Sequence, residues 1–285
     1  MKLKLSQRIA ISYYRAKIKT ISLLSKKLAA EKALTIFCTP FSGKPKRAIP
    51  HLFHQAEKLV CHTNNLKLVG WQWNAKNSNG KKVLIAHGFD SCSYKFDKLI
   101  QHLLSAGFTV LAFDAPAHGL SDGKTVNALD YKKALLAINK QVEDLYCIIG
   151  HSLGGLAASL AAEEMHELKK LILIAPATET QRAIDNFFKY VPLGKDIKDE
   201  IEKIIYNFEQ KPVSYYAVSR SVQTITIPVF WVHDSHDWIC PFEDVKPIVD
   251  LHLNHIQFYI SNGLGHNKIY RNNTVMQKIT DFLIH

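Results

Sequence analysis

The chain has 285 residues, 47% of them hydrophobic, which is enough for one large domain with a full core or for two small ones. Lysine and arginine outnumber aspartate and glutamate by 36 to 25, and residues 1–50 hold 12 of the basic residues against a single acid, Glu31. The net charge of +11 therefore belongs to the N-terminal segment, and residues 51–285 are neutral overall. Five cysteines at irregular spacing exclude a disulfide framework and a zinc-binding pattern, and they suit a reducing cytoplasm.

Residues 5–36 form the first predicted element, an amphipathic helix. Its apolar positions recur at spacings of three and four residues, apart from one gap at Ser25, and they are Ile11, Tyr14, Ile18, Ile21 and Leu28. The same helical geometry places four basic residues on an adjacent stripe, namely Arg8, Arg15, Lys19 and Lys26. No secretion-signal pattern is present, and basic residues interrupt every window of about 20 residues that would be needed to span a membrane.

Two interpretations of this N-terminal arm, residues 1–37, remain open. In the first, its apolar stripe packs on the rest of the protein and leaves the basic stripe in solvent. In the second, residues 1–36 lie on an anionic membrane surface, where each basic residue contributes about 1 kcal/mol. A nucleic-acid partner is not expected, because no recognisable nucleic-acid-binding module accompanies the basic stripe.

From about residue 66 onward, strand and helix patterns alternate without a linker, so we predict one α/β domain with a mostly parallel sheet and helices on both faces. The predicted strands are Lys67–Asn74, Lys82–Ala86, Thr109–Asp114, Tyr146–Gly150, Lys170–Ala175, Pro228–His233 and Ile256–Ser261. The predicted helices are Ser93–Ala106, Ala128–Gln141, Leu153–His166, Phe242–Leu253 and Thr274–Leu283.

Between Ala177 and about Thr224 this alternation lapses. Two segments, Thr180–Tyr190 and Lys198–Gln210, look helical, and the region is rich in aromatic residues. Some of the aromatic side chains must form a local core. Others could line a pocket for an acyl or other apolar group, and the candidates are Phe187, Phe188 and Tyr190.

A strand, a sharp turn and a helix meet at the sequence Gly150-His151-Ser152-Leu153-Gly154. The apolar residues 145–149 before it are typical of a buried strand, and the small residues 155–162 after it are typical of a helix. A serine at the apex of such a turn, with glycines where side chains would collide, indicates a nucleophile elbow. The turn exposes the serine hydroxyl, and the helix N-terminus favours negative charge that develops beside it.

A serine nucleophile needs a base within hydrogen-bond reach, and the base needs an acid that orients it. Asp234 and Asp237 follow the strand at 228–232, and His266 follows the strand at 256–260. Each lies beyond the C-terminal end of a strand, where open α/β sheets place their sites. The residues alone leave both aspartates open as the orienting acid.

Two further segments complete a series of five motifs. His87-Gly88-Phe89, which follows the strand at 82–86, resembles an oxyanion-hole loop, and residues 109–121 resemble a strand that ends in an Asp-x-Pro…Gly-x-Ser turn. With the elbow, the acid loop and the Gly-x-Gly-His loop, the series resembles the α/β-hydrolase superfamily over roughly residues 60–285.

This resemblance implies roles for individual residues. Ser152 would be the nucleophile and His266 the general base and acid. Asp237 would orient His266, because it precedes Pro241 by four residues as the family's acid typically precedes a proline, and Asp234 remains the alternative.

The resemblance also implies an α/β-hydrolase domain over residues 38–285, with a helical lid inserted at about 178–224. The oxyanion hole would consist of the backbone N–H groups of Phe89 and Leu153. His151, beside the nucleophile, would either line the substrate pocket or pack beneath it.

The remaining histidines are expected to be structural. His87 would shape the oxyanion turn from beneath, and His118 with Asp114 would brace the site. Three pairs at i, i+3 spacing, His51/His54, His233/His236 and His252/His255, are not expected to bind metal, since no cysteine or carboxylate completes a ligand set. No cofactor is expected either.

The function that follows is a serine hydrolase, foremost a carboxylic-ester hydrolase acting on a small to medium apolar ester or acyl substrate. Peptidase or amidase, thioesterase and C–C hydrolase activities use the same triad and remain alternatives. A non-catalytic ligand-binding protein on the same fold is the competing class. The expected location is the cytoplasm, with peripheral attachment to the inner membrane face left open and the oligomeric state undetermined.

Overall fold

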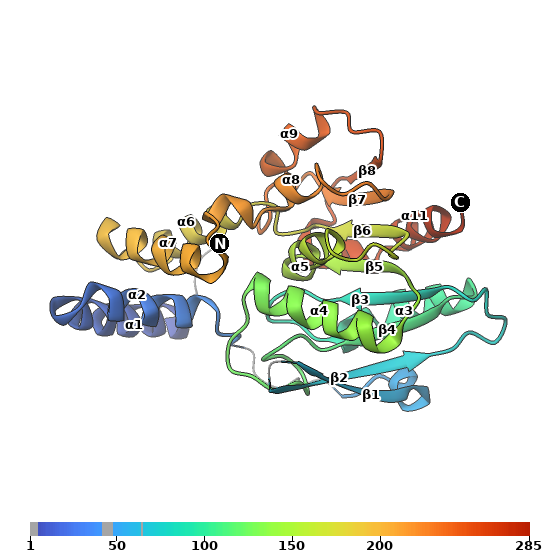
Figure 1. Cartoon of the computed structure of the whole chain (residues 1–285), viewed down its shortest axis with the longest axis horizontal. Helices are drawn as coiled ribbons and strands as arrows, with labels where there is room; N and C mark the ends of the chain where they lie inside the picture. Colours follow the sequence, from blue (N-terminus) through green and yellow to red (C-terminus); the bar gives the residue numbers. More distant parts are fainter. Residues whose placement is uncertain (1–4, 42–47, 64) are drawn as a thin grey trace. The chain divides into compact units, whose positions relative to one another are not determined.

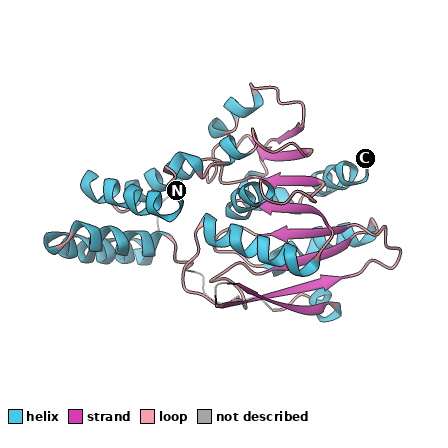
Figure 2. Cartoon of the chain, in the orientation of Figure 1, coloured by secondary structure: helices cyan, strands magenta, loops and turns pink. Residues whose placement is uncertain are grey.

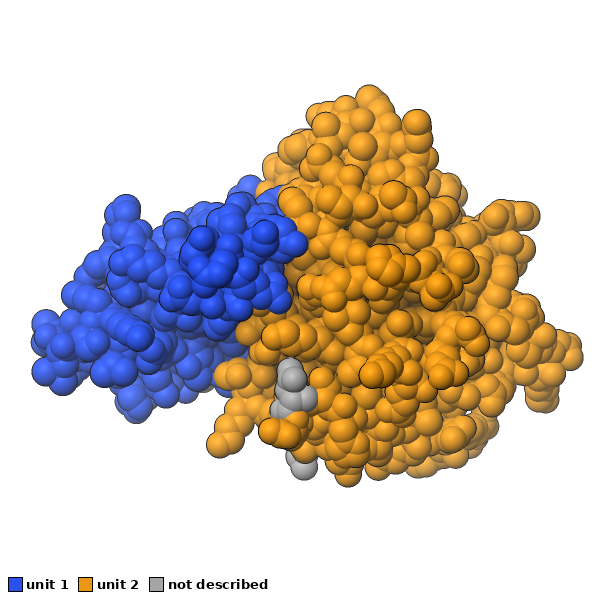
Figure 3. All heavy atoms as spheres, viewed as in Figure 1, with its two compact units in different colours: residues 1–39, 179–217 blue, residues 40–178, 218–285 orange. Residues whose placement is uncertain are grey.

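The computed structural model of the chain describes residues 5–41, 48–63 and 65–285. Residues 1–4, where the predicted arm begins, and residues 42–47 and 64 lie outside the described part. The chain divides into two compact units, which Figure 3 distinguishes by colour. Unit 1 consists of residues 1–39 and 179–217, and unit 2 consists of residues 40–178 and 218–285. The segments considered as an arm and as a lid insertion thus contribute to the same unit.

Unit 2 is built on one eight-stranded sheet of order β1-β2-β4-β3-β5-β6-β7-β8 (Figures 1 and 2). The strands are β1 (Glu57–Thr63), β2 (Leu66–Trp73), β3 (Lys82–Ala86), β4 (Thr109–Phe113), β5 (Leu145–His151), β6 (Lys170–Ile174), β7 (Val229–Asp234) and β8 (Ile256–Ser261). The first two pairings, β1 with β2 and β2 with β4, are antiparallel, and every later pairing is parallel. All the predicted strands are present, and the predicted fold class is confirmed.

Helices cover both faces of this sheet. Helix α4 (Ala128–Val142) packs against α5 (Leu153–Ala162) on one face, and α3 (Asp97–Ser105) packs against α11 (Asn273–Ile284) on the other (Figure 1). Strands β3 to β7 are therefore buried almost throughout, as their continuous apolar sequences require. The carboxyl ends of the parallel strands remain available for a site.

One predicted helix of unit 2 is much shorter than expected. In place of a helix over 242–253, the structure has a 3₁₀ turn, Phe242–Asp244, and the one-turn helix α9, Lys246–Val249. Pro247 lies in the first turn of α9, where proline is tolerated, but His252 adopts a φ of +48°, which no helix accommodates. The prediction was wrong here because the apolar spacing continues to Leu253, beyond the residue at which the helical backbone ends, Val249.

Unit 1 consists mainly of four helices: α1 (Leu5–Leu24), α2 (Lys26–Phe37), α6 (Thr180–Tyr190) and α7 (Lys195–Glu209). The single predicted helix over 5–36 is present as two helices, because the hydroxyl of Ser25 accepts a hydrogen bond from the Leu28 N–H at 3.2 Å and caps the start of α2. Helix α1 packs on α2, and α2 packs on α7. Lys26 forms an ion pair with Asp196 of α7 at 2.6 Å. Its charge is therefore paired within unit 1, unlike the free basic stripe expected for the arm.

The apolar stripe of the arm lies largely inside unit 1. Ile18 is fully buried, and Ile11, Tyr14 and Ile21 are partly buried, whereas Leu28 is exposed. In α2, the small residues Ala29, Ala30 and Ala33 are completely buried. Among the described helices, none is both long enough and apolar enough to cross a lipid bilayer.

Candidate active site

Ser152 occupies the predicted strand–turn–helix junction between β5 and α5. Its backbone has φ +54° and ψ −122°, a strained conformation for a residue with a side chain. A side chain at Gly154 would overlap the carbonyl oxygens of Ala86 and His87, so only glycine lets the turn approach the end of β3 this closely. The sequence therefore produces a tight junction that holds the Ser152 side chain at the end of the sheet.

His266 and Asp237 come together from two separate loops. The Nδ1–H of His266, on the short helix α10 (Gly265–Lys268), donates to Oδ2 of Asp237 at 2.7 Å. The other carboxylate oxygen of Asp237 accepts the backbone N–H groups of Ile239 and Cys240 at 2.9 and 3.0 Å. Both side chains are buried, so this hydrogen bond to a carboxylate is shielded from water, and Nε2 of His266 is left to act as the proton acceptor.

Asp234, the other candidate acid, is occupied elsewhere. At the end of β7 its carboxylate accepts the Ser261 hydroxyl at 2.7 Å, the Leu264 N–H at 2.9 Å and the His236 N–H at 3.0 Å. Burial works to raise the pKa of Asp234, but these hydrogen bonds outweigh it and hold the pKa at about 2. Asp234 thus fastens the loops that follow β7 and β8, and Asp237 pairs with the histidine.

His87 and His118 support the loop that carries Phe89. Nε2 of His87 accepts the Ala115 N–H at 2.9 Å, and its Nδ1–H donates to the Gly88 carbonyl at 2.8 Å. His118 likewise accepts the Asp90 N–H through Nε2 at 2.9 Å. Neighbouring Asp114 accepts the backbone N–H groups of Ser93 and Leu120, each at 2.9 Å. These contacts fit the bracing roles expected for His87, His118 and Asp114.

The braced loop lies directly against the elbow. A Cβ placed on Gly88 would stand 2.8 Å from the Cβ of Ser152, so the loop and the serine are in van der Waals contact. Leu153 is the first residue of α5, where backbone N–H groups have no helical partner. Within the described part of the chain, the N–H groups of Phe89 and Leu153 have no protein acceptor. Two backbone donors without a protein acceptor therefore belong to the two segments that meet at the serine.

His151 packs beneath the histidine of the pair. Its Nε2–H donates to the backbone carbonyl of His266 at 3.1 Å, and its ring contacts those of His266 and Tyr270 at centroid distances of 4.7 and 4.8 Å. His151 is buried, and its Nδ1 would lie 3.0 Å from a Cβ placed on Gly88. His151 thus takes a packing position that links both loops.

Cys240 is a neighbour of the site that the sequence did not single out. Burial and the charge of Asp237 raise the pKa of its thiol, and a hydrogen bond with the Ser152 side chain opposes this. Its backbone also contributes, since the N–H donates to Asp237 and the carbonyl accepts Nε2–H of His233 at 2.8 Å. No spacing pattern could have identified it, because its contacts arise only when the loop folds.

The aromatic residues considered for a substrate pocket lie in unit 1. Phe187 meets Phe37 and Phe188 edge to face, at centroid distances of 5.5 and 5.7 Å, and Tyr190 is half exposed. Phe187 therefore belongs to the contact between α2 and α6, and the pocket role of all three candidates stays a prediction.

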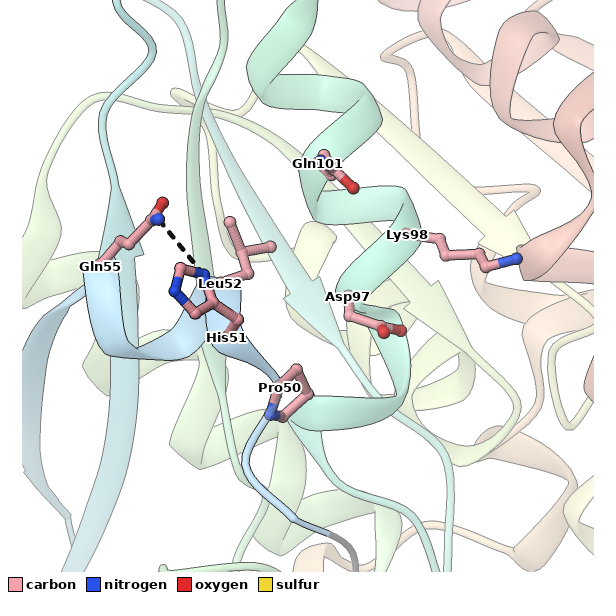
Figure 4. A pocket seen from close by; sticks show the side chains of 7 residues that line it. All are labelled: Pro50, His51, Leu52, Gln55, Asp97, Lys98 and Gln101. Carbon is pink, nitrogen blue, oxygen red and sulfur yellow. Dashed lines mark hydrogen bonds between the residues drawn. The ribbon is translucent and has the colours of Figure 1, made fainter.

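Two surface depressions of unit 2 are separate from the motif residues. One, of about 270 Å³, lies between the 3₁₀ helix His51–Gln55 and α3, where Gln55 hydrogen-bonds His51 (Figure 4). The other, of about 380 Å³, is lined by residues of α3 and α11. Among the described residues, no three metal-binding side chains gather into a ligand set, the paired histidines included.

Four of the buried histidines should make the stability of the protein sensitive to acid. Burial is the main cause that lowers the pKa of His87, to about 3, and the pKa values of His118, His151 and His233. The unfolded chain binds protons at these histidines below the ordinary pKa of about 6.5, and the folded protein binds them only at lower pH, so acid favours unfolding. Because the pKa of His87 in the folded protein is about 3, His87 alone should cost about 1.6 kcal/mol of unfolding free energy between pH 6.5 and 5, and the other three histidines add to this loss. Urea titrations across this range would measure the loss.

The matched variants are His87→Asn, which should reduce the pH slope by about 1 kcal/mol per pH unit over this range, and His166→Gln at an exposed position, which should not change it. An unfolding free energy that stays level from pH 6.5 to 5 would contradict the assignment of neutral buried rings.

Comparisons with known proteins relate the chain to hydrolases. The family model for serine aminopeptidase, S33, matches residues 77–211. "Putative esterase/lipase 2" of Mycoplasma pneumoniae is 26% identical over 224 residues, covering 66% of this chain and 82% of the relative. Monoglyceride lipase of Homo sapiens is 24% identical over 248 residues, covering 73% and 79%.

A solved structure shares the fold. The esterase Pf2001 of Pyrococcus furiosus superposes with a TM-score of 0.67 at 23% identity, covering 86% of this chain and 96% of that one. The order of strands, the elbow and the matched relatives lead to one conclusion: the chain has the α/β-hydrolase fold and is a hydrolase similar to known esterases and lipases.

Proposed function

We propose that the protein hydrolyses carboxylic esters through Ser152, His266 and Asp237. The observation that carries this proposal is the buried 2.7 Å hydrogen bond between Asp237 and His266, made by loops that follow β7 and β8. Together with a serine in a strained turn at the end of β5, it supplies a base, its orienting acid and a nucleophile.

In the proposed reaction, Nε2 of His266 takes the proton from Ser152 as Oγ attacks the ester carbonyl. The tetrahedral intermediate collapses when His266 returns that proton to the departing alcohol, which leaves an acyl-serine. His266 then takes a proton from water, the resulting hydroxide attacks the acyl group, and the proton returns to Ser152 as the carboxylic acid leaves. Asp237 stabilises the imidazolium at both stages and keeps Nδ1 protonated.

The backbone N–H groups of Phe89 and Leu153 are the proposed oxyanion hole. Both donors lack a protein acceptor within the described residues, and the loop of Phe89 is held rigidly by His87 and His118. Donors fixed before the reaction need no rearrangement as negative charge develops, and each is worth about 3–4 kcal/mol in the transition state.

The proposed substrate is a small to medium, largely apolar ester or acyl compound. The monoglyceride lipase and esterase relatives support an ester, and the aromatic residues of α6 support an apolar acyl group. We propose a helical lid over about residues 178–224, with Phe187, Phe188 and Tyr190 as candidate pocket residues. His151 acts from beneath, by holding the backbone of His266.

Amide hydrolysis is the second candidate, because the matching family model is that of a serine aminopeptidase. Thioester and C–C bond hydrolysis use the same residues but have no separate observation in their favour. A non-catalytic binding protein would have no need to retain a complete, buried Asp–His pair.

Labelling with a fluorophosphonate probe tests the proposal. Because the probe reacts with activated serines, we expect one stoichiometric adduct, located at Ser152 by peptide mass spectrometry and absent from Ser152→Ala. The labelled protein should also lose all esterase activity. A folded protein without an adduct at high probe concentration would rule out the serine mechanism. A panel of nitrophenyl esters of increasing chain length, run beside amide and thioester analogues, then separates the substrate classes.

We also propose a cytoplasmic location, with peripheral attachment to the inner membrane face through residues 1–36. The odd number of cysteines suits a reducing compartment. The concentration of the whole net charge in residues 1–50 supports an anionic partner for this segment.

A further inference from the structure

Helix α1 has a second apolar face, which the sequence pattern did not reveal. Ile9, Tyr13, Leu23 and Leu24 are 62%, 60%, 84% and 89% exposed. With 3.6 residues per turn, these four side chains project within about 100° of one another, on the side of the helix opposite to buried Ile18. The stripe expected to meet either the protein or a membrane is thus buried in unit 1, and a different stripe of large apolar side chains remains in solvent.

Basic residues border this exposed stripe on both sides. Helical geometry places Arg8, Arg15 and Lys19 along one border and Lys17 along the other, and all four are exposed. The ammonium group of Lys17 lies 5.9 Å from the centre of the Tyr13 ring. Within the described residues, none of these four forms an ion pair with a carboxylate, in contrast to Lys26.

An apolar stripe between basic borders matches the interface of an anionic lipid layer. The apolar side chains enter the region between headgroups and acyl chains, and lysine and arginine extend their charged ends to the lipid phosphates. A second copy of this chain fits the same surface poorly, because it would bring two segments of strongly positive charge together. Charge complementarity therefore selects the membrane.

We propose that the outward face of α1, formed by Ile9, Tyr13, Leu23 and Leu24 with Arg8, Arg15, Lys17 and Lys19 as its borders, docks the protein on an anionic membrane surface. This inference rests on the proposed peripheral attachment, assigns it to a specific face, and does not depend on the ester hydrolase chemistry. The opposite stripe, of buried Ile18 and partly buried Ile11, Tyr14 and Ile21, remains for the packing of α1 within unit 1, so one helix serves both contacts.

Co-sedimentation of the full chain with vesicles tests the proposal. The vesicles are either pure phosphatidylcholine or an equimolar mixture of phosphatidylcholine and phosphatidylglycerol. Strong binding is expected only to the anionic vesicles at low salt, and it should weaken as salt shortens the range of the attraction. Removal of one basic residue near such a surface weakens binding about fivefold, so the triple reversal Arg8→Glu, Arg15→Glu, Lys19→Glu should weaken it at least about 100-fold.

The apolar contribution is tested by the triple variant Ile9→Ser, Leu23→Ser, Leu24→Ser, which should weaken binding at least about 30-fold because three large side chains no longer enter the lipid. Matched controls change exposed residues of unit 2: Lys133→Glu, Lys140→Glu, Lys169→Glu for the charge, and Leu251→Ser, Ile284→Ser for the apolar surface. Both controls should bind like the wild type. All variants should keep the wild-type thermal transition and hydrolyse a soluble ester at the wild-type rate.

Three results would overturn the proposal, and each points to a different cause. If the wild-type chain does not sediment with anionic vesicles even at low salt, there is no peripheral attachment. If it sediments and both α1 variants do so equally well, another surface makes the contact. If sedimentation velocity shows a wild-type dimer that the serine variant dissociates, the face belongs to a second copy. A wild-type protein that hydrolyses no ester would contradict the proposed activity and leave the membrane proposal standing.

Discussion

Replacement of Ser152 by alanine is expected to lower kcat toward an ester by about 10⁴- to 10⁶-fold. Without Oγ no acyl-enzyme can form, and only the contribution of substrate binding and of the Phe89 and Leu153 donors remains. Steady-state hydrolysis of a nitrophenyl ester, with the thermal transition measured on the same sample, gives the result. The fold should persist, because alanine adopts the strained turn no less readily than serine.

Ser159→Ala is the matched control. Ser159 is a buried serine of the same helix α5, and its hydroxyl donates only to the Leu156 carbonyl. Its loss should leave kcat nearly unchanged. Wild-type turnover in Ser152→Ala would remove the serine mechanism altogether.

Asp237→Asn should lower kcat by about 10⁴-fold, the size of the effect in a comparable triad. An amide in place of the carboxylate cannot stabilise the imidazolium, and its NH₂ group favours the tautomer of His266 with the proton on the wrong nitrogen. The backbone N–H groups of Ile239 and Cys240 can still donate to the amide oxygen, so the loop should fold. The measurement is kcat, with the urea unfolding free energy as the structural readout.

Asp234→Asn is the contrasting variant. A carboxyl whose pKa falls to about 2 on folding stabilises the native state above the unfolded value near 3.8, and this stabilisation is lost as the pH falls through 2. At neutral pH the substitution should therefore cost about 2 kcal/mol of unfolding free energy and change kcat little. The opposite ranking of the two variants in kcat would assign Asp234 as the orienting acid. Equal, small losses would point to an acid elsewhere in the chain.

Most of the fold follows from local sequence patterns, and the exceptions have identifiable causes. The inner strands are continuous apolar runs because helices cover both faces, and such runs are easily recognised. Strand β1 was not predicted, because it lies at the sheet edge with only Cys61 fully buried and shows no clear alternation. In the sequence Ser25 shows only as a gap in the apolar stripe, whereas in the structure its side chain caps the start of a new helix.

The candidate site was predictable to the level of loops but not of hydrogen bonds. The sequence offers both Asp234 and Asp237, and only the fold brings Ser261 and Leu264 to the carboxylate of Asp234. The contact of His151 could not be inferred, since its partner is a backbone carbonyl 115 residues away. Backbone carbonyls are present at every position, so no residue type marks them in a sequence.

The discontinuity of unit 1 has a consequence for the order in which the chain folds. Helices α1 and α2 are synthesised first, but the contact between α2 and α7 can form only after α7 has been made. The whole of residues 40–178 intervenes, and closing so long a loop is slow. During synthesis the first two helices therefore carry uncovered apolar surface while the sheet of unit 2 begins to form. A nascent chain halted before residue 195 should bind a chaperone or a lipid surface through these helices, and its release should follow the arrival of α7.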